Sequence, residues 1–275
     1  MWTTCCGSVV DLRKLHPLDD ERSCAVLHHR RGVQSVESCR GEAFGVCSEL
    51  FVFKSGLRVP RGLSFREGDI AYSYARSAIN CPDNTCLWPK SIDGFVYVPY
   101  ILSPLYGISF LRTFLPDHYT MLSVPRCWSF LGQTGGSQVL SLQSPGCMWA
   151  GIAAHEFMHA LGFVHEQSRS DRDHYVTIVW KNIMPEHIHN FRKQATNNLN
   201  SPYDYSSVMH YGRYAFSEDG GPTIIPRPDP YIPIGQRDGP SALDLHKINT
   251  LYDCGRYNDT KQLYYLIILI IADLL

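Results

Sequence analysis

One eleven-residue stretch, from His155 to His165, constrains the fold and chemistry of this chain more than any other. His155 and His159 are four positions apart, so on a helix they lie one turn apart on the same face and can bind one metal ion. Gly162 can take a positive φ and end the helix, so that a sharp turn returns His165 as a third ligand. Three histidines with a fourth position left open are typical of a catalytic zinc site.

The residue after the first histidine completes the pattern HExxHxxGxxH. Glu156 stands where a carboxylate can hold and deprotonate a metal-bound water without binding the metal itself. The competing interpretation is a helix that carries surface histidines by chance. It would leave the register of Gly162 and His165 as a coincidence, so the pattern favours a zinc site with one Zn²⁺ per chain.

Composition narrows the class of protein further. The chain has 275 residues, 44% of them hydrophobic, which suffices for one large domain with flanking segments. A net charge of -1 gives no reason to expect nucleic acid as a partner. Ten cysteines indicate an oxidising compartment, so we expect a secreted protein. We also expect a monomer. Met1 to Leu50 nevertheless lacks the basic and apolar regions of a signal peptide.

The chain divides by sequence character into four parts. Residues 1–62 show no regular hydrophobic period and are expected to be poorly ordered, and 63–76 is expected to be a remnant of a pro-segment. Asp69 in this remnant is either part of a solvated turn or a carboxylate that occupies the open metal position and keeps an enzyme latent. Residues 77–254, which carry the zinc pattern, form the expected main domain, and 255–275 a tail. The apolar run in the tail is about half the roughly 20 residues that span a membrane.

Hydrophobic periodicity predicts an α+β fold with two lobes. The expected elements are strands over 94–102, 119–124 and 137–142, the zinc helix over 148–161, an irregular region after His165, and a helix over 241–252 with Ser241 as N-cap and Asp244 at N3. Substrate is expected in the cleft between the sheet-and-helix lobe and the irregular lobe.

From Ala75 to Cys254 the sequence resembles the astacin family of zinc endopeptidases, which are metzincins. The zinc motif continues to Asp173 as in the extended astacin signature, and Ser207 to Tyr211 resembles the family's Met-turn. Gly68-Asp69-Ile70 is similar to the astacin pro-segment. Cysteine positions, Cys81 and Cys86 among them, resemble the six-cysteine branch of fish hatching enzymes.

This resemblance implies roles for individual residues. His155, His159 and His165 would bind zinc, Glu156 would be the general base and then the acid, and Asp69 would be the latency switch. Tyr211 would swing to hydrogen-bond the oxyanion, and Met209 would pack beneath the metal. Cys127 with Cys147, and Cys81 with Cys86, would be disulfides. The implied activity is hydrolysis of extracellular protein, egg envelope included.

The chain departs from the family between Ser103 and Arg126. This segment is too short for the family's long backing helix, and it lacks the cysteine that pairs with the last one, so Cys254 would be free or would pair with an N-terminal cysteine. The zinc helix would lose packing surface. A second hypothesis therefore stands beside the active endopeptidase, namely a catalytically impaired zinc-binding member with a truncated scaffold.

Overall fold

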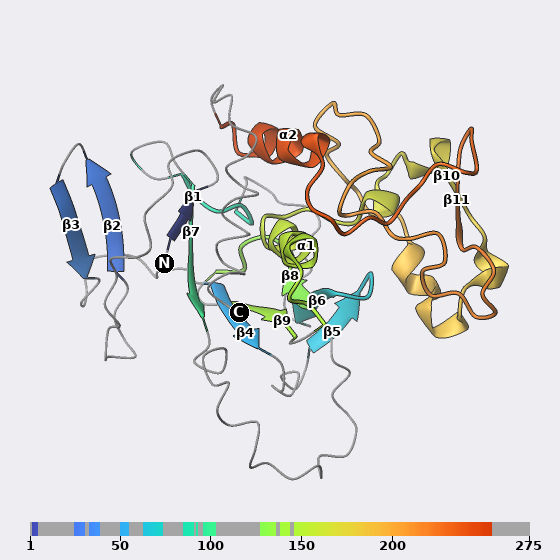
Figure 1. Ribbon diagram of the computed structural model, residues 1–275, viewed down its shortest axis with the longest axis horizontal. Helices are drawn as coiled ribbons and strands as arrows, with labels where there is room; N and C mark the ends of the chain where they lie inside the picture. Colours follow the sequence, from blue (N-terminus) through green and yellow to red (C-terminus); the bar gives the residue numbers. More distant parts are fainter. Residues whose placement is uncertain are drawn as a thin grey trace, which may run out of the picture.

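The computed structural model describes residues 2–4, 25–30, 33–38, 50–54, 63–73, 85–90, 92, 96–102, 127–135, 138–143 and 146–254. Within these ranges the chain forms a mixed β-sheet, two α-helices and a long, mostly irregular segment (Figure 1). The predicted strand at 119–124, the connection from Ser103 to Arg126, Cys81 and the tail after Cys254 lie outside the described residues. None of the described helices is long and apolar enough to cross a membrane.

Seven strands form one mixed sheet. Their order across it is β1 (Trp2–Thr4), β7 (Tyr97–Leu102), β4 (Leu50–Lys54), β9 (Gln138–Leu142), β8 (Trp128–Phe130), β6 (Ile70–Ser73) and β5 (Leu63–Arg66). β4 runs parallel to β7 and β9, β6 runs parallel to β8, and the other pairs are antiparallel. A separate hairpin joins β2 (Ala25–Arg30) to β3 (Val33–Ser38). The region before residue 63, expected from sequence to be poorly ordered, thus carries β1 to β4 in the structure.

Helix α1 (Ala150–Ala160) packs against β8 and β9 and carries the first two histidines. Its alanines favour a helix and keep it slim enough to be buried on most sides. Gly151 is required in its first turn, because a Cβ there would lie 1.8 Å from the carbonyl oxygen of Arg237. The helix ends as predicted, with Gly162 at a φ of 98°.

The main hydrophobic core lies around α1. Inward-facing Leu140 and Leu142 of β9 alternate with half-buried neighbours, as a strand with one covered face requires. Helix α2 (Ala242–Leu251) adds Ile248 to the same core, although it follows the irregular segment in sequence. Its capping box joins Ser241 and Asp244, as the sequence predicted.

A second core stabilises the segment between the two helices. This segment contains a two-stranded sheet of β10 (Val176–Ile178) and β11 (Ile224–Pro226). It also contains four 3-10 turns, at Glu166–Ser168, Arg172–His174, Trp180–Asn182 and Pro185–Phe191. Phe191 is fully buried in this core, together with the buried rings of Tyr203 and Tyr211. Two cores, one on either side of the histidines, agree with the expected two-lobed α+β architecture.

Candidate active site

Three histidine rings converge on one point beside α1. The Nε2 atom of His155 lies 3.2 Å from Nε2 of His159 and 3.2 Å from Nε2 of His165. With Zn–N bonds of about 2.0–2.1 Å, ligands at the corners of a tetrahedron stand roughly 3.3–3.4 Å apart, so this spacing suits one zinc ion. All three rings are buried, at most 3% exposed, and their close approach is that of a ligand set.

The outer ring nitrogen of each histidine has its own hydrogen-bond partner. Nδ1 of His155 donates to the carbonyl oxygen of Val208 at 2.9 Å, and Nδ1 of His159 donates to that of Phe163 at 2.7 Å. Nδ1 of His165 donates to the carboxylate of Glu67 at 2.7 Å. A proton held on Nδ1 leaves the lone pair of Nε2 directed inward, which is the tautomer that a metal needs.

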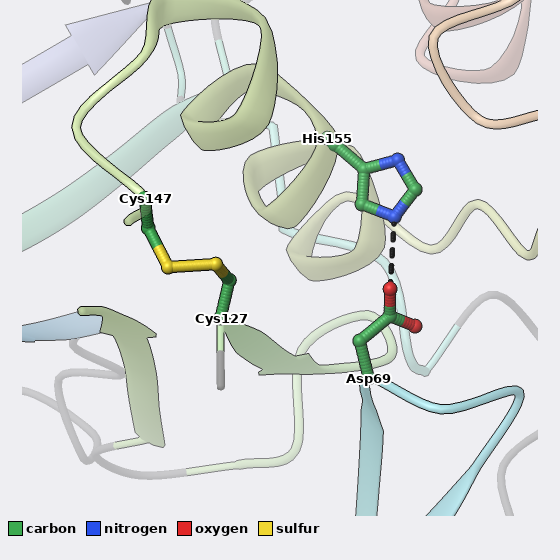
Figure 2. The surroundings of a disulfide bond; sticks show 4 residues. All are labelled: Asp69, Cys127, Cys147 and His155. Carbon is green, nitrogen blue, oxygen red and sulfur yellow. Dashed lines mark hydrogen bonds and ion pairs between the residues drawn. A yellow bond between two sulfur atoms is a disulfide. The ribbon is translucent and has the colours of Figure 1, made fainter. Parts of the chain in front are cut away.

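The fourth donor comes from the turn between β5 and β6. Asp69 places one carboxylate oxygen 3.1 Å from Nε2 of His155 (Figure 2). Its other carboxylate oxygen lies 3.4 Å from Nε2 of His159 and 3.3 Å from Nε2 of His165. Together the four residues offer ligand atoms within 4.8 Å of one another. This is an arrangement that fits a buried divalent cation, with Asp69 at the position that the three histidines leave open.

Glu156 lies next to this cluster without joining it. Its side chain is 1% exposed, and among the described residues its Oε2 has no hydrogen-bond partner. Burial, and then the negative charge of Asp69, raise the pKa of Glu156 well above its usual value, while Arg237 opposes the shift. A buried carboxyl with an unused oxygen and a raised pKa is suited to exchange protons with a water or a substrate.

The electrostatics of the cluster favour a cation. Burial lowers the pKa of His155 to about 3, so this ring is neutral, as a ligand must be. Burial also disfavours a charged His165, but the carboxylates of Asp69 and Glu67 outweigh it and raise that pKa to about 9. Against the effect of burial, His165 and the neighbouring histidines hold the pKa of Asp69 well below its usual value. The carboxylate of Asp69 therefore provides negative charge where a metal cation would sit, and that of Glu67 lies on the outer side of the His165 ring.

Tyr211 and Met209 come from a turn within the irregular segment, before β11. The hydroxyl of Tyr211 donates a short hydrogen bond to the carbonyl oxygen of Glu67, and its ring packs edge-on to His165 with centroids 4.5 Å apart. Met209 is 2% exposed in the main core, and its carbonyl oxygen accepts from the backbone N–H of Glu166 at 3.1 Å. The turn is thereby fastened to the residue that follows His165.

Four of the described cysteines are in disulfide bonds. Cys127 is bonded to Cys147, the pairing that the resemblance implies, and this bond joins the beginning of β8 to the loop before α1 (Figure 2). Cys86 and Cys254 are each disulfide-bonded as well. The alternative that Cys254 is a free thiol is therefore wrong. The proposed partner of Cys86, Cys81, lies outside the described residues.

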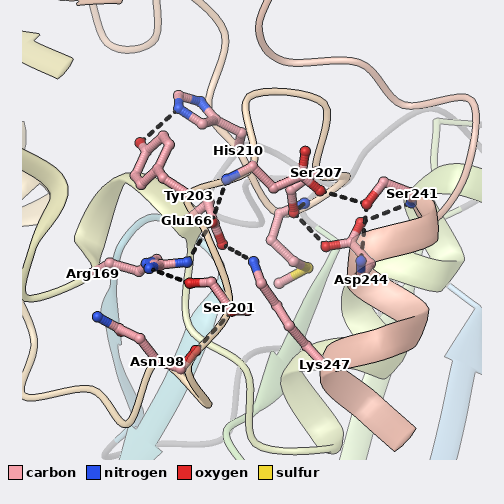
Figure 3. Close-up of polar contacts among 12 residues, drawn as sticks. Glu166, Arg169, Asn198, Ser201, Tyr203, Ser207, His210, Ser241, Asp244 and Lys247 are labelled. Carbon is pink, nitrogen blue, oxygen red and sulfur yellow. Dashed lines mark hydrogen bonds and ion pairs between the residues drawn. The ribbon is translucent and has the colours of Figure 1, made fainter. Parts of the chain in front are cut away.

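A buried ionic network follows His165 directly. Glu166 accepts from Lys247 at 2.7 Å, from Arg169 at 3.0 Å and from the backbone N–H of Asp204 at 2.8 Å (Figure 3). Burial raises the pKa of Glu166, and Lys247 and Arg169 counteract that shift. Glu166 also lines a cavity of about 360 Å³, which none of the four clustered metal donors lines. The network joins the histidine loop to α2.

The structure thus brings together the residues that the sequence selected, namely His155, His159, His165, Glu156, Asp69 and Tyr211. Sequence reasoning missed Glu67 as a partner of His165. It also missed Asp244 as a support of His155: Asp244 accepts from the backbone N–H of Val208, whose carbonyl oxygen receives Nδ1 of His155. The only signal for Glu67 in the sequence was its position next to Gly68-Asp69. Asp244 was expected only as a helix cap.

Comparisons with known proteins agree with this geometry. The family model Astacin, which describes a family of peptidases, matches residues 111–253. High choriolytic enzyme 2 of Oryzias latipes is 47% identical over 209 residues, covering 68% of this chain and 75% of the relative. An astacin-like metalloendopeptidase of Coturnix japonica is 46% identical over 213 residues, covering 70% of this chain and 52% of that relative.

A solved structure shows the same fold. It is high choriolytic enzyme 1, a hatching-enzyme zinc-protease from Oryzias latipes, which matches with a TM-score of 0.54 and 40% identity over 65% of this chain and 100% of that one. Sequence, fold and the histidine cluster agree on the class: the chain is a zinc metalloendopeptidase, and its substrates are proteins. More particularly, it belongs to the astacin family of peptidases.

Proposed function

We propose that this chain hydrolyses peptide bonds of extracellular protein, with zinc held by His155, His159 and His165 and with Glu156 as the general base. The observation that carries the proposal is the convergence of three Nε2 atoms, that of His155 being 3.2 Å from each of the other two, beside the unpaired Oε2 of Glu156. Bound zinc supplies Lewis acidity, which polarises a carbonyl and lowers the pKa of a water.

The chain's own groups move the protons. Glu156 takes a proton from the attacking water and gives it to the leaving amine, which its raised pKa favours. Tyr211 supplies a hydrogen bond to the substrate oxygen as that oxygen gains negative charge. To do so its hydroxyl must first leave the carbonyl oxygen of Glu67.

Asp69 holds the intact chain latent in this proposal. Its carboxylate already lies within 3.1–3.4 Å of all three Nε2 atoms, so it competes with water for the open position. Cleavage between Arg76 and Ser77 would remove it together with the hairpin β5–β6 and leave 77–254 as the peptidase domain. The contacts that must break are the pairs of β6 with β8, at Ile70–Ser129 and Ala71–Phe130, and those of β1 and β4, which also precede Arg76, with β7 and β9.

Egg-envelope protein is the substrate class that the relatives suggest, because choriolytic and hatching enzymes are among them. Secretion is supported by the disulfide between Cys127 and Cys147 and by the bonded state of Cys86 and Cys254. Such bonds persist in oxidising compartments, where an egg envelope is also found.

The test compares the full chain with Glu156→Gln after cleavage behind Arg76, with casein and isolated egg-envelope protein as substrates. Loss of a general base lowers turnover by about 10²–10⁴-fold, so Glu156→Gln is expected to bind zinc but cleave neither substrate at a comparable rate. Glu186→Gln is the matched control, because Glu186 is exposed. Equal rates for the wild type and Glu156→Gln would contradict the proposal, and a zinc-loaded but inactive wild type would favour the impaired alternative.

A further inference from the structure

We propose that Glu67 is a positioning residue for the third metal ligand: its carboxylate fixes the ring of His165 from the outer side for as long as the hairpin β5–β6 stays attached. This inference rests on the proposed function, and it adds a second carboxylate to the action of Asp69. The hairpin would then control the histidine cluster from two directions.

The outer partners of the three histidines set His165 apart. Val208 and Phe163, which receive Nδ1 of His155 and His159, offer backbone carbonyl oxygens from within 77–254. Only His165, among these three, donates to a side-chain carboxylate, and that carboxylate belongs to the segment proposed to be removed. A carboxylate partner on Nδ1 fixes the orientation of the ring and makes its Nε2 a stronger ligand.

Glu67 is itself held firmly in this position. Its Oε2 accepts both from Nδ1 of His165 at 2.7 Å and from the backbone N–H of His165 at 3.2 Å, and its side chain is 2% exposed. A carboxylate buried so deeply is stable only when its hydrogen bonds are made. The hydroxyl of Tyr211 fastens the backbone of the same residue.

The turn leaves little freedom for another arrangement. Glu67 and Gly68 both have a positive φ, of 50° and 85°. A Cβ on Gly68 would lie 2.9 Å from Cζ of Phe216, so the turn passes close against that ring. As a result Glu67 and Asp69 approach one imidazole at opposite nitrogens, 2.7 Å from Nδ1 and 3.3 Å from Nε2.

Two consequences follow for the intact chain. Loss of the outer partner weakens zinc binding. Removing such a partner typically lowers metal affinity by about 10–100-fold. Its loss also loosens the turn that carries Asp69, so at saturating zinc the intact chain gains peptidase activity. A variant at Glu67 and the wild type become the same molecule once cleavage behind Arg76 has removed residue 67, which makes the cleaved protein its own control.

The experiment uses the full chain as wild type, Glu67→Ala, Glu67→Gln and the exposed control Glu186→Ala. The zinc dissociation constant of each intact protein is measured by competition with a chromogenic chelator, and casein cleavage is measured before and after processing. We expect Glu67→Ala to raise the dissociation constant by about 10-fold or more, and Glu67→Gln, whose amide oxygen can still accept both hydrogen bonds, to raise it less. Glu186→Ala should match the wild type.

The differences should disappear after processing. An unchanged dissociation constant in Glu67→Ala would overturn the inference, and so would a Glu67→Gln value as poor as that of Glu67→Ala. If Glu67→Ala does not fold, the isosteric Glu67→Gln decides: a higher zinc dissociation constant than that of the wild type supports the inference, and an unchanged one overturns it. Failure of the proposed function looks different: the cleaved wild type would bind zinc without cleaving casein, while the comparison at Glu67 would still stand. A wild type that binds no zinc would overturn both.

Discussion

Asp244 of α2 accepts a hydrogen bond of 2.9 Å from the backbone N–H of Val208, and the carbonyl oxygen of Val208 in turn receives Nδ1 of His155. The same carboxylate accepts from the hydroxyl of Ser207 at 2.6 Å and caps its own helix at Ser241 (Figure 3). One buried side chain near the end of the domain thereby positions a histidine in α1.

Asp244→Ala is therefore expected to damage both stability and the metal site. It removes three hydrogen bonds to a carboxylate that is 1% exposed, and at about 1 kcal/mol each the free energy of unfolding should fall by about 3 kcal/mol. Urea unfolding measures this loss, and chelator competition should show weaker zinc binding. Asp238→Ala, at an exposed position, is the control. Equal unfolding midpoints for the two variants would refute the connection.

The buried pair of Lys247 and Glu166 gives a second prediction. Lys247→Met leaves a carboxylate that is 5% exposed without one of its two cations, and breaking such a pair costs about 3–5 kcal/mol. Adding Glu166→Gln should recover part of that loss, because the uncompensated charge is then gone. Thermal unfolding of the single and double variants tests this, with exposed Lys181→Met as the control. Strictly additive effects would show that the two residues do not interact.

Tyr211→Phe should act on turnover more than on substrate binding. The ring remains packed against His165, but the hydroxyl that we propose for the substrate oxygen is lost. Removing one such donor lowers kcat by about 10²-fold. Steady-state kinetics of the cleaved enzyme should show this fall with KM little changed. A fall confined to KM would assign Tyr211 to ground-state binding instead.

The lowered pKa of buried His210 leads us to expect that the free energy of unfolding depends on pH. Its Nδ1 donates to the carbonyl oxygen of Tyr211 and its Nε2 accepts from Tyr203, and burial lowers its pKa from 6.5 to about 4. Between these values the unfolded chain binds a proton that the folded chain does not, so stability is complete above pH 6.5 and is lost as the pH falls. From pH 7 to pH 5 the loss should be about 2 kcal/mol.

Urea unfolding of the wild type and His210→Asn at both pH values isolates this contribution. The difference in unfolding free energy between the two proteins should shrink at pH 5, because the variant lacks the titrating group. His246→Asn, at an exposed position of α2, should follow the wild type. If His210→Asn keeps the full pH dependence, another group is responsible for it.

Sequence alone determined the features that depend on residues close together in the chain. The spacing of His155, His159 and His165 fixed the histidine cluster, Gly162 fixed the end of α1, and Ser241 with Asp244 fixed the start of α2. These features follow from the helical repeat and from capping, which act over a few residues. The astacin resemblance rested on the same local motifs, and the comparisons confirm it.

Tertiary structure decided which distant residues meet. The sheet places β6 beside β8, and so brings Asp69 to His155 across 86 positions and Glu67 to His165 across 98. Tertiary structure also places Asp244, expected only as a helix cap, where it accepts from the backbone N–H of Val208. It brings Cys254 into a disulfide bond as well. No local period records such pairings, because they depend on how the whole chain packs its hydrophobic surfaces, and that packing is settled only when the cores around α1 and Phe191 form.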